Sequence, residues 1–275
     1  FECEAESLYR LASLAHYDGQ PGDAFAIAIE ARDFAMAHDV PLVVAWSLSL
    51  IGLVHSNSGN HSEALSCSLQ ALDCYRGTGH RIDEGNMLNT IASIYHELGD
   101  TDRAIVNYEA AMNANAQLNR PDFDAITLAN VASLRAERGE FDTAIEIGER
   151  ALALCRMHAV GFLPEVLAAL AGAYGGRGEF DQARTLLNAA LAMLDASSVS
   201  FDDAVRSSVE LAFGRVELSA KNDAEALSHF CHALGLAEVI NAKPIEFSAH
   251  CALADLYKAM GKFEEIDRIF TSPTL

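Results

Sequence analysis

The side chains best suited to metal chemistry gather near the C-terminal end of this sequence. His229 and His232 lie one helical turn apart in the segment SHFCH, which also contains Cys231. His250 and Cys251 follow in the next expected helix. Imidazole and thiolate groups bind zinc, but the ligands of a metal must converge on one point. On helices these side chains point to several faces. The sequence therefore predicts no metal site and no cofactor.

Catalytic motifs are missing from the sequence as well. It contains no nucleophile elbow, no HExxH zinc motif, no P-loop and no dinucleotide fingerprint. A hydrolase or metalloenzyme that uses the histidines and cysteines is the remaining catalytic alternative. The six cysteines form no CxxC pair, and they are typical of small apolar filler in a reducing compartment. We expect a binding protein rather than an enzyme, with a cytoplasmic location.

Charge and composition restrict the partners. The chain has 275 residues with 39 acidic and 19 basic side chains, a formal net charge of −20. Such a chain repels phosphate backbones and anionic lipid surfaces, so we expect no nucleic-acid and no membrane partner. Alanine and leucine dominate and only six prolines interrupt them, which favours helix. The sequence opens on Phe1 rather than Met, and we expect it to be a segment of a longer chain.

A spacing of about 40 residues organises the whole chain. Small residues recur at intervals of 40, 40, 40, 39, 43 and 40: Ala12, Gly52, Ala92, Ala132, Ala171, Gly214 and Ala254. Seven residues after each comes a turn position, which is Gly except at Lys221, and five residues later a second site, which is Ala except at Ile266 in the last repeat. Two antiparallel helices approach closely only where the side chains between them are small. The pattern therefore predicts a stack of helical hairpins, each too small to bury its apolar face alone.

The segment NTIASIYHELGDTDRAIVNYEAAM, residues 89–112, resembles a tetratricopeptide repeat. It carries that family's characteristic residues at Ile91, Ala92, Tyr95, Gly99, Ala104, Tyr108 and Ala111. The usual period is 34, and the longer unit here resembles those of kinesin light chains, bacterial peptide-pheromone receptors and bacterial sensor regions. The resemblance implies an all-α, right-handed α-solenoid of about seven helix-turn-helix repeats in one domain, residues 1–275. The expected repeats are 1–39, 40–79, 80–119, 120–159, 160–200, 201–242 and 243–275.

In this family the first helices usually line a concave groove that binds the ligand. Positions −6, −3, +1 and +4 relative to the small residue share that face, since their spacings are 3, 4 and 3. In repeats four to six these positions are Ile126, Ala129, Ser133, Ala136, Glu165, Ala168, Gly172, Gly175, Ser208, Leu211, Arg215 and Leu218. The predicted groove is mostly neutral and rich in hydrogen-bonding groups, which suits a peptide backbone.

The predicted partner-binding residues are Trp46, Ser49, Asn86, Asn89, Ser93, His96, Asn130 and Ser133. The competing interpretation is that the Asn and Ser side chains only solvate an exposed helix face. Arg215 and Lys258 are too isolated to clamp a terminal carboxylate, so recognition of a free C-terminus is disfavoured. Asn89 and Asn130 come from consecutive first helices, and we expect them to hold backbone groups of one extended peptide.

Two features have alternative explanations. Trp46, the one tryptophan, is either a ligand anchor with Tyr9 beside it or a cap on the junction of repeats one and two. The segment GAYGG, Gly172 to Gly176, either lets a ligand backbone approach closely or frays the helix before the Gly178 turn, and we favour fraying.

The sequence thus predicts a scaffold or sensor module that binds a protein segment or an extended peptide in its groove. The alternative is a regulatory and oligomerisation region of a bacterial signalling protein that controls a fused cyclase or DNA-binding domain outside this segment. The seventh repeat looks incomplete. We expect it to leave apolar surface near Phe263, Ile266 and Phe270 that docks on a second copy or on a missing helix.

Overall fold

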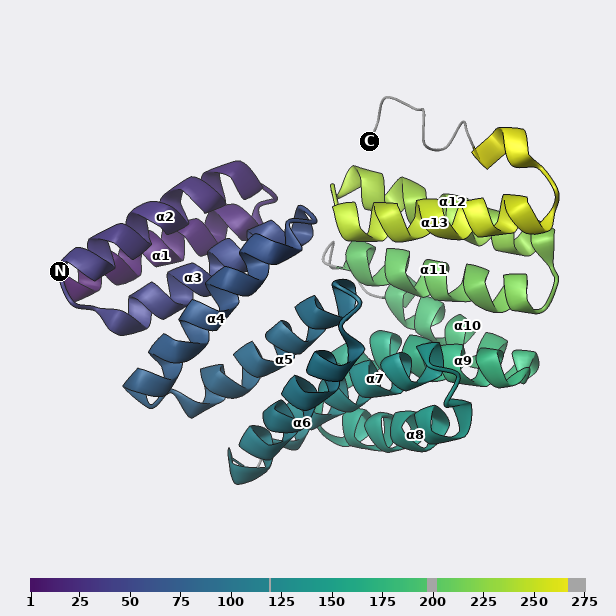
Figure 1. Ribbon diagram of the computed structural model, residues 1–275, viewed down its shortest axis with the longest axis horizontal. Helices are drawn as coiled ribbons and strands as arrows, with labels where there is room; N and C mark the ends of the chain where they lie inside the picture. Colours follow the sequence, from purple (N-terminus) through teal and green to yellow (C-terminus); the bar gives the residue numbers. More distant parts are fainter. Residues whose placement is uncertain (119, 197–201, 267–275) are drawn as a thin grey trace. The chain divides into compact units, whose positions relative to one another are not determined.

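A computed structural model describes residues 1–118, 120–196 and 202–266 of the chain, without the side chains of Asp122 and Asp202. The described residues form α-helices and one short 3-10 turn, with no strand among them (Figure 1). The predicted all-α class is confirmed, and the chain is an α-solenoid of helix-turn-helix units.

Helices alternate between the first and second members of successive hairpins. The first helices are α1 (Glu2–Tyr17), α3 (Pro41–Asn57), α5 (Arg81–Glu97), α7 (Pro121–Glu137), α9 (Leu163–Arg177), α11 (Asp202–Ser219) and α13 (Lys243–Ala259). The second helices are α2 (Pro21–Ala37), α4 (His61–Thr78), α6 (Thr101–Leu118), α8 (Phe141–His158), α10 (Phe180–Ala196) and α12 (Asp223–Val239), and the 3-10 turn η1 (Val160–Phe162) precedes α9. After Gly261 a further helix begins at Phe263 and is described as far as Ile266.

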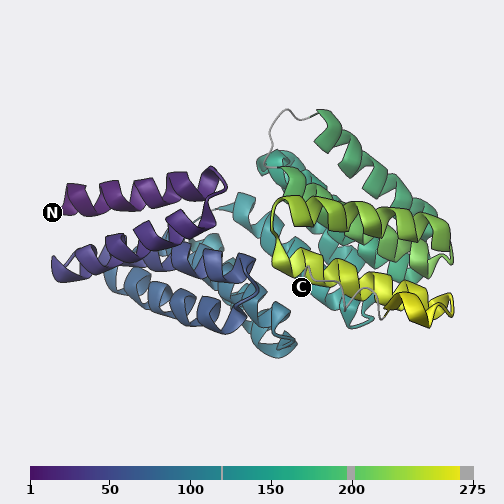
Figure 2. The same cartoon turned by 90° about the horizontal axis from the view of Figure 1, so that it is seen from above.

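The chain forms two compact units, residues 1–123 and 124–275. In the first unit α1 packs on α2, α3 on α4 and α5 on α6, and successive hairpins meet through α2–α3 and α4–α5 (Figures 1 and 2). In the second unit α9 packs on α10 and α11 on α12, while α9 contacts α11 and α12 contacts α13. The expectation that all seven repeats form one continuous domain stays a prediction.

Small residues lie where helices cross, as their spacing predicts. Ala12, Ala92, Ala132 and Ala171 are fully buried, and so are the second-helix alanines at 24, 64, 104, 144, 183 and 226. Gly214 has the tightest packing requirement of its series, because a Cβ there would meet the ring of Phe230, which is itself fully buried. Close backbone approach at these crossings thus explains the small residues found there.

The turn inside each hairpin has a left-handed backbone conformation at the position seven residues after the small residue of the first helix. Five of the six glycines of the series fall between φ 70° and 78°, and Gly178 has φ 90°. Lys221 replaces glycine in the sixth repeat and still has φ 62°. The hairpin geometry is therefore kept at a conformational cost that a glycine would avoid.

Candidate functional site

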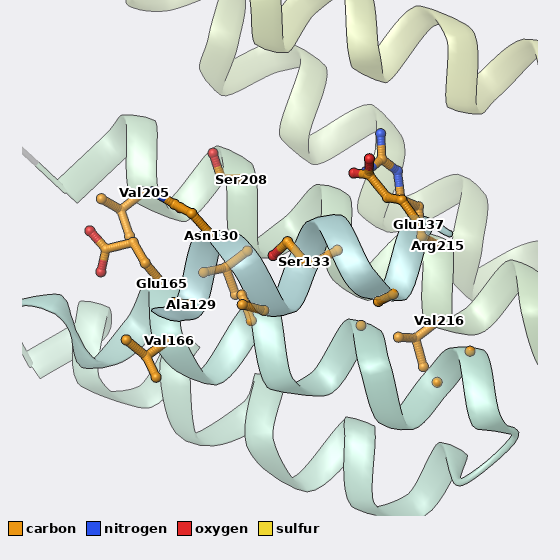
Figure 3. Close-up of a pocket in the computed structure, with 18 of the residues that line it drawn as sticks. Ala129, Asn130, Ser133, Glu137, Glu165, Val166, Val205, Ser208, Arg215 and Val216 are labelled. Atoms are coloured by element: carbon orange, nitrogen blue, oxygen red, sulfur yellow. The ribbon is translucent and has the colours of Figure 1, made fainter. Parts of the chain in front are cut away.

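A cavity of about 580 Å³ lies in the second unit among the first helices α7, α9 and α11 (Figure 3). Its walls are mostly apolar, with alanines from all three helices and valines from α9 and α11. Phe141 from α8 and Phe162 from η1 complete the lining. The cavity is thus a groove on the face that first helices share, which the helical periodicity predicts.

Most of the groove positions inferred from the repeat line this cavity. All four from α7, all four from α9, and Ser208 and Arg215 from α11 are among the lining residues. Leu211 and Leu218 are not. Leu211 is 7% exposed and packs with Phe230 and Leu253, and Leu218 packs against the same cluster. These two leucines do not line the cavity as predicted, because they pack toward α12 and α13, where Leu211 is buried and Leu218 is half-buried.

Polar groups mark the length of the cavity. Asn130 and Ser133 of α7 and Ser208 of α11 bring an amide and two hydroxyls to its wall. In Figure 3, Glu165 lies at the end nearer Val205, whereas Glu137 and Arg215 lie together at the other end. The site therefore offers hydrogen-bonding groups along an apolar floor, with two carboxylates and one guanidinium at its ends.

Glycines in α9 shape the floor of the cavity. The expected fraying is not observed, because α9 is helical as far as Arg177 and ends at Gly178. A Cβ on Gly175 would lie 2.8 Å from Val216 Cγ2, and one on Gly176 would meet the ring of Phe141. A Cβ on Gly172 would meet nothing within 4 Å. Packing thus requires two of these glycines, and the third faces open space.

A buried ion pair fixes α11 on the helix before it. Arg184 of α10 donates two hydrogen bonds to Glu217, from Nε at 2.6 Å and from a terminal nitrogen at 2.9 Å. Asn222 donates a third to the same carboxylate at 2.6 Å. The hydrogen bonds from Arg184 lower the pKa of Glu217 even though burial acts to raise it. Because Val216 is next to Glu217, this pair positions one wall of the cavity.

The histidines that suggested metal chemistry have a carboxylate partner instead. His229 Nδ1 lies 2.6 Å from Glu210 Oε2, and His232 Nδ1 lies 2.9 Å from Glu210 Oε1. The ring of His229 stacks on Phe213 at 4.1 Å between centroids, and His250 Nδ1 lies 2.9 Å from the Glu246 carbonyl oxygen. Among the described residues, no group of three or more His, Cys, Asp or Glu side chains is arranged to hold a metal ion.

The predicted site residues on α3 lie in the first unit. The rings of Trp46 and Tyr9 are 5.5 Å apart between centroids, so Tyr9 lies beside the tryptophan as expected. The hydroxyl of Ser49 donates to the Ala45 carbonyl at 2.8 Å and lies 2.9 Å from the Tyr75 hydroxyl. The hydroxyl of Ser49 therefore already has hydrogen-bond partners within the fold. The Trp46–Tyr9 pair bridges the first two hairpins, which leaves both explanations of Trp46 open.

The predicted residues on α5 also lie in the first unit. Asn86, Asn89 and Ser93 are half-buried, and the side-chain Oδ1 of Asn86 is buried with no hydrogen-bond partner among the described residues. Asn89 and His96 both have interactions within the fold. Asn130 and Ser133 lie on α7 in the second unit, where both line the larger cavity. The predicted residues on α5 belong to the first unit and do not line that cavity. A role in binding stays a prediction for all eight residues.

A smaller cavity of about 280 Å³ lies in the first unit among α4, α5 and α6. Arg76 Nε and a terminal nitrogen of Arg81 donate to Glu84 at 3.0 and 2.9 Å. Burial raises the pKa of Glu84, but these two hydrogen bonds outweigh it and the net shift is downward. The cavity is therefore lined by a satisfied ion-pair cluster.

Some lining residues of the larger cavity were not predicted. Glu137 lies next to the predicted face of α7. Val205, Val209, Ala212 and Val216 lie on another side of α11, which packs with Leu167 and Ala171 of α9, so the predicted groove face did not include them. Phe162 comes from η1, whose position follows from packing rather than from periodicity, so no sequence signal indicated it.

None of the helices in the described residues combines the length and apolar content needed to cross a membrane.

Several solved structures share this fold at low sequence identity. The Rap protein complexed with competence and sporulation factor superposes with a TM-score of 0.77 at 16% identity, over 97% of this chain and 72% of that one. NprR in complex with its cognate peptide NprX gives 0.76 at 14%, over 100% and 78%. The Rap conjugation gene regulator of plasmid pLS20, in complex with the Phr* peptide, gives 0.74 at 13%, over 94% and 70%.

Sequence comparison identifies the repeat itself. No curated protein matches the chain significantly. The family model of the tetratricopeptide repeat matches residues 43–117 and 83–157, which include the segment that first suggested the resemblance. The register of the matched segments agrees with the hairpins α3–α4, α5–α6 and α7–α8. Residues 43–157 of the chain are therefore tetratricopeptide repeats.

Proposed function

We propose that this protein binds a short extended peptide in the cavity among α7, α9 and α11. The observation that carries the proposal is that three consecutive first helices bring Asn130, Ser133 and Ser208 to the wall of one apolar cavity of about 580 Å³. Amide and hydroxyl side chains pair with the N–H and C=O groups of a peptide backbone. The proposed role is binding, not catalysis.

The dimensions of the cavity suit a peptide of a few residues. The lining residues of α9 run from Glu165 to Gly176. At a rise of about 1.5 Å per residue this stretch is roughly 16 Å long. An extended chain advances about 3.3 Å per residue, so about five residues fit along it.

Charge and structural similarity support a peptide rather than another ligand. The cavity has two carboxylates, Glu137 and Glu165, against the one guanidinium of Arg215, and the whole chain has a net charge of −20. This balance favours neutral or cationic ligands over anionic ones. NprR and the pLS20 regulator, which share the fold, were both solved with bound peptides.

The test is a selection of pentapeptides from a randomised library on the parent protein, followed by calorimetric titration of the selected peptide. Asn130→Ala should weaken binding by about 1–3 kcal/mol, since it leaves peptide groups without a partner in a desolvated site. Its matched control is Asn107→Ala on α6, because the Asn107 amide donates to the Arg103 carbonyl of its own helix at 2.8 Å. Selection of no peptide, or equal binding by Asn130→Ala and the parent, would contradict the proposal.

A further inference from the structure

The three glycines of α9 that line the cavity have different surroundings. Gly175 and Gly176 lie against Val216 and Phe141, so a side chain at either position collides with a neighbour. Gly172 also lines the cavity, but a Cβ there would meet nothing within 4 Å. Glycine weakens a helix interior relative to alanine. At Gly172, therefore, the helix contains a weakening residue that no packing contact in the described part of the chain requires.

The space in front of Gly172 belongs to the larger cavity. Ala168 and Ala169, one turn earlier on the same face of α9, also line it and have only methyl side chains. Ser133 of α7 and Arg215 of α11 occupy the same repeat position as Gly172 and line the cavity as well (Figure 3). The middle helix thus forms a recessed floor between two helices that have polar side chains at this position.

We propose that Gly172 is a specificity-determining residue: it keeps a subsite open for one bulky apolar side chain of the bound peptide. This inference rests on the proposed function and adds the chemistry of the ligand. The occupant is a neutral or cationic peptide, because Glu137 and Glu165 outnumber Arg215 in the lining and disfavour a nucleotide or a fatty acid. Its large aliphatic or aromatic side chain packs on the backbone at Gly172, and its own backbone pairs with Asn130 and Ser133.

Substitutions at Gly172 fill this subsite in steps without disturbing the fold. Alanine adds one methyl group and strengthens the helix, while leucine occupies the volume intended for the ligand side chain. Full burial of one large apolar side chain corresponds to a factor of about 10–100 in affinity. We therefore expect Gly172→Leu to weaken binding of the selected peptide by that factor, and Gly172→Ala to have a smaller effect.

Gly235 provides a matched control. It lies inside α12 on an exposed face, and a Cβ there also meets nothing within 4 Å, but it lies outside the cavity. Gly172→Ala and Gly235→Ala should each raise the melting temperature by about 2–4 °C through helix propensity. Gly235→Leu should leave peptide affinity unchanged.

The experiment compares a randomised pentapeptide library selected on the parent, on Gly172→Leu and on Gly235→Leu, with calorimetric titration of the peptide that the parent selects. The inference predicts one position enriched in large apolar residues on the parent and on Gly235→Leu, and a shift to small residues at that position on Gly172→Leu. An unchanged preference and affinity on Gly172→Leu would overturn the inference while leaving the proposed function intact. If the parent selects no peptide, the proposed function fails and this inference with it.

Discussion

Removal of the Arg184 guanidinium should destabilise the second unit more than loss of an ordinary surface ion pair. The side chain of Glu217 is 4% exposed, and its carboxylate accepts hydrogen bonds from Arg184 and Asn222. Breaking a buried pair costs about 3–5 kcal/mol because one charge stays buried without its partner. The side chain of Arg184 is 30% exposed, so water partly replaces it. We therefore expect Arg184→Met to cost about 2–3 kcal/mol.

Thermal unfolding followed by helical circular dichroism tests this value. At about 2–4 °C per kcal/mol for a chain of this size, Arg184→Met should lower the melting temperature by about 5–10 °C. The double variant Arg184→Met/Glu217→Met should recover most of the loss, since an apolar pair of similar size needs no charge compensation. The control is Arg10→Met, whose partner Glu6 is half-exposed at 3.4 Å and whose own side chain is 76% exposed.

Acid provides a second readout of the same pair. The hydrogen bonds from Arg184 lower the pKa of Glu217 in the folded chain below its ordinary value of 4.5. A depressed carboxylate pKa stabilises the fold above the unfolded pKa, and this stabilisation is lost as pH falls through the folded pKa. The difference between the parent and Arg184→Met should therefore shrink in acid. A cost below about 0.5 kcal/mol at neutral pH, equal to that of Arg10→Met, would refute the reasoning.

The remaining predictions concern backbone strain, packing, acid sensitivity and association. Lys221→Gly should raise stability by about 0.5–1 kcal/mol in urea titration, because relief of the left-handed strain at φ 62° exceeds the added flexibility of the unfolded chain; a loss would contradict it. Gly214→Ala should cost about 1–3 kcal/mol in the same assay, because its Cβ meets the buried ring of Phe230; a gain like that of Gly235→Ala would count against it. Burial raises the pKa of Glu210, but its contacts with His229 and His232 produce a net downward shift, so the destabilisation caused by Glu210→Gln should decrease as pH falls through that pKa; a pH-independent cost would exclude this. Phe247 and Phe263 are 61% and 63% exposed, so sedimentation should show association that rises with concentration and weakens in Phe263→Ser; a monomer at high concentration would exclude it.

Helix pairing and the shared face of the first helices follow from the sequence because both depend on local spacing. The interval of about 40 residues predicts the buried alanines, and positions −6, −3, +1 and +4 of α7 and α9 then identify eight of the thirteen lining residues on these two helices. Helical periodicity assigns Ala168 and Gly172 to the groove, although neither side chain has a reactive group that would indicate a site.

The sequence predicted contacts between helices less accurately. Leu211 and Leu218 occupy groove positions by spacing, yet they pack with residues of α12 and α13, which bury Leu211 and half-bury Leu218. The glycines of GAYGG suggested a frayed end, whereas Val216 and Phe141 require two of them in a continuous helix. Such outcomes depend on side chains from the partner helix and from neighbouring repeats, which the pattern of a single helix does not describe. Of the residues predicted to leave apolar surface at the seventh repeat, Phe263 is exposed and Ile266 is half-buried, and Phe270 lies outside the described residues.

Two expectations about partners stay predictions. The pairing of one peptide by Asn89 and Asn130 involves helices of both units, and only Asn130 lies in the cavity of the second. The regulatory alternative, with control of a fused output domain and a cytoplasmic location, also stays a prediction.

Hydrogen–deuterium exchange with and without the selected pentapeptide tests the central claim most directly. Binding in the proposed cavity should slow amide exchange in the first helices α7, α9 and α11, and should leave the second helices α8, α10 and α12 nearly unchanged, since the lining residues lie almost entirely on the first helices. Protection confined to the second helices, or to the first unit alone, would contradict the assignment of this cavity as the binding site.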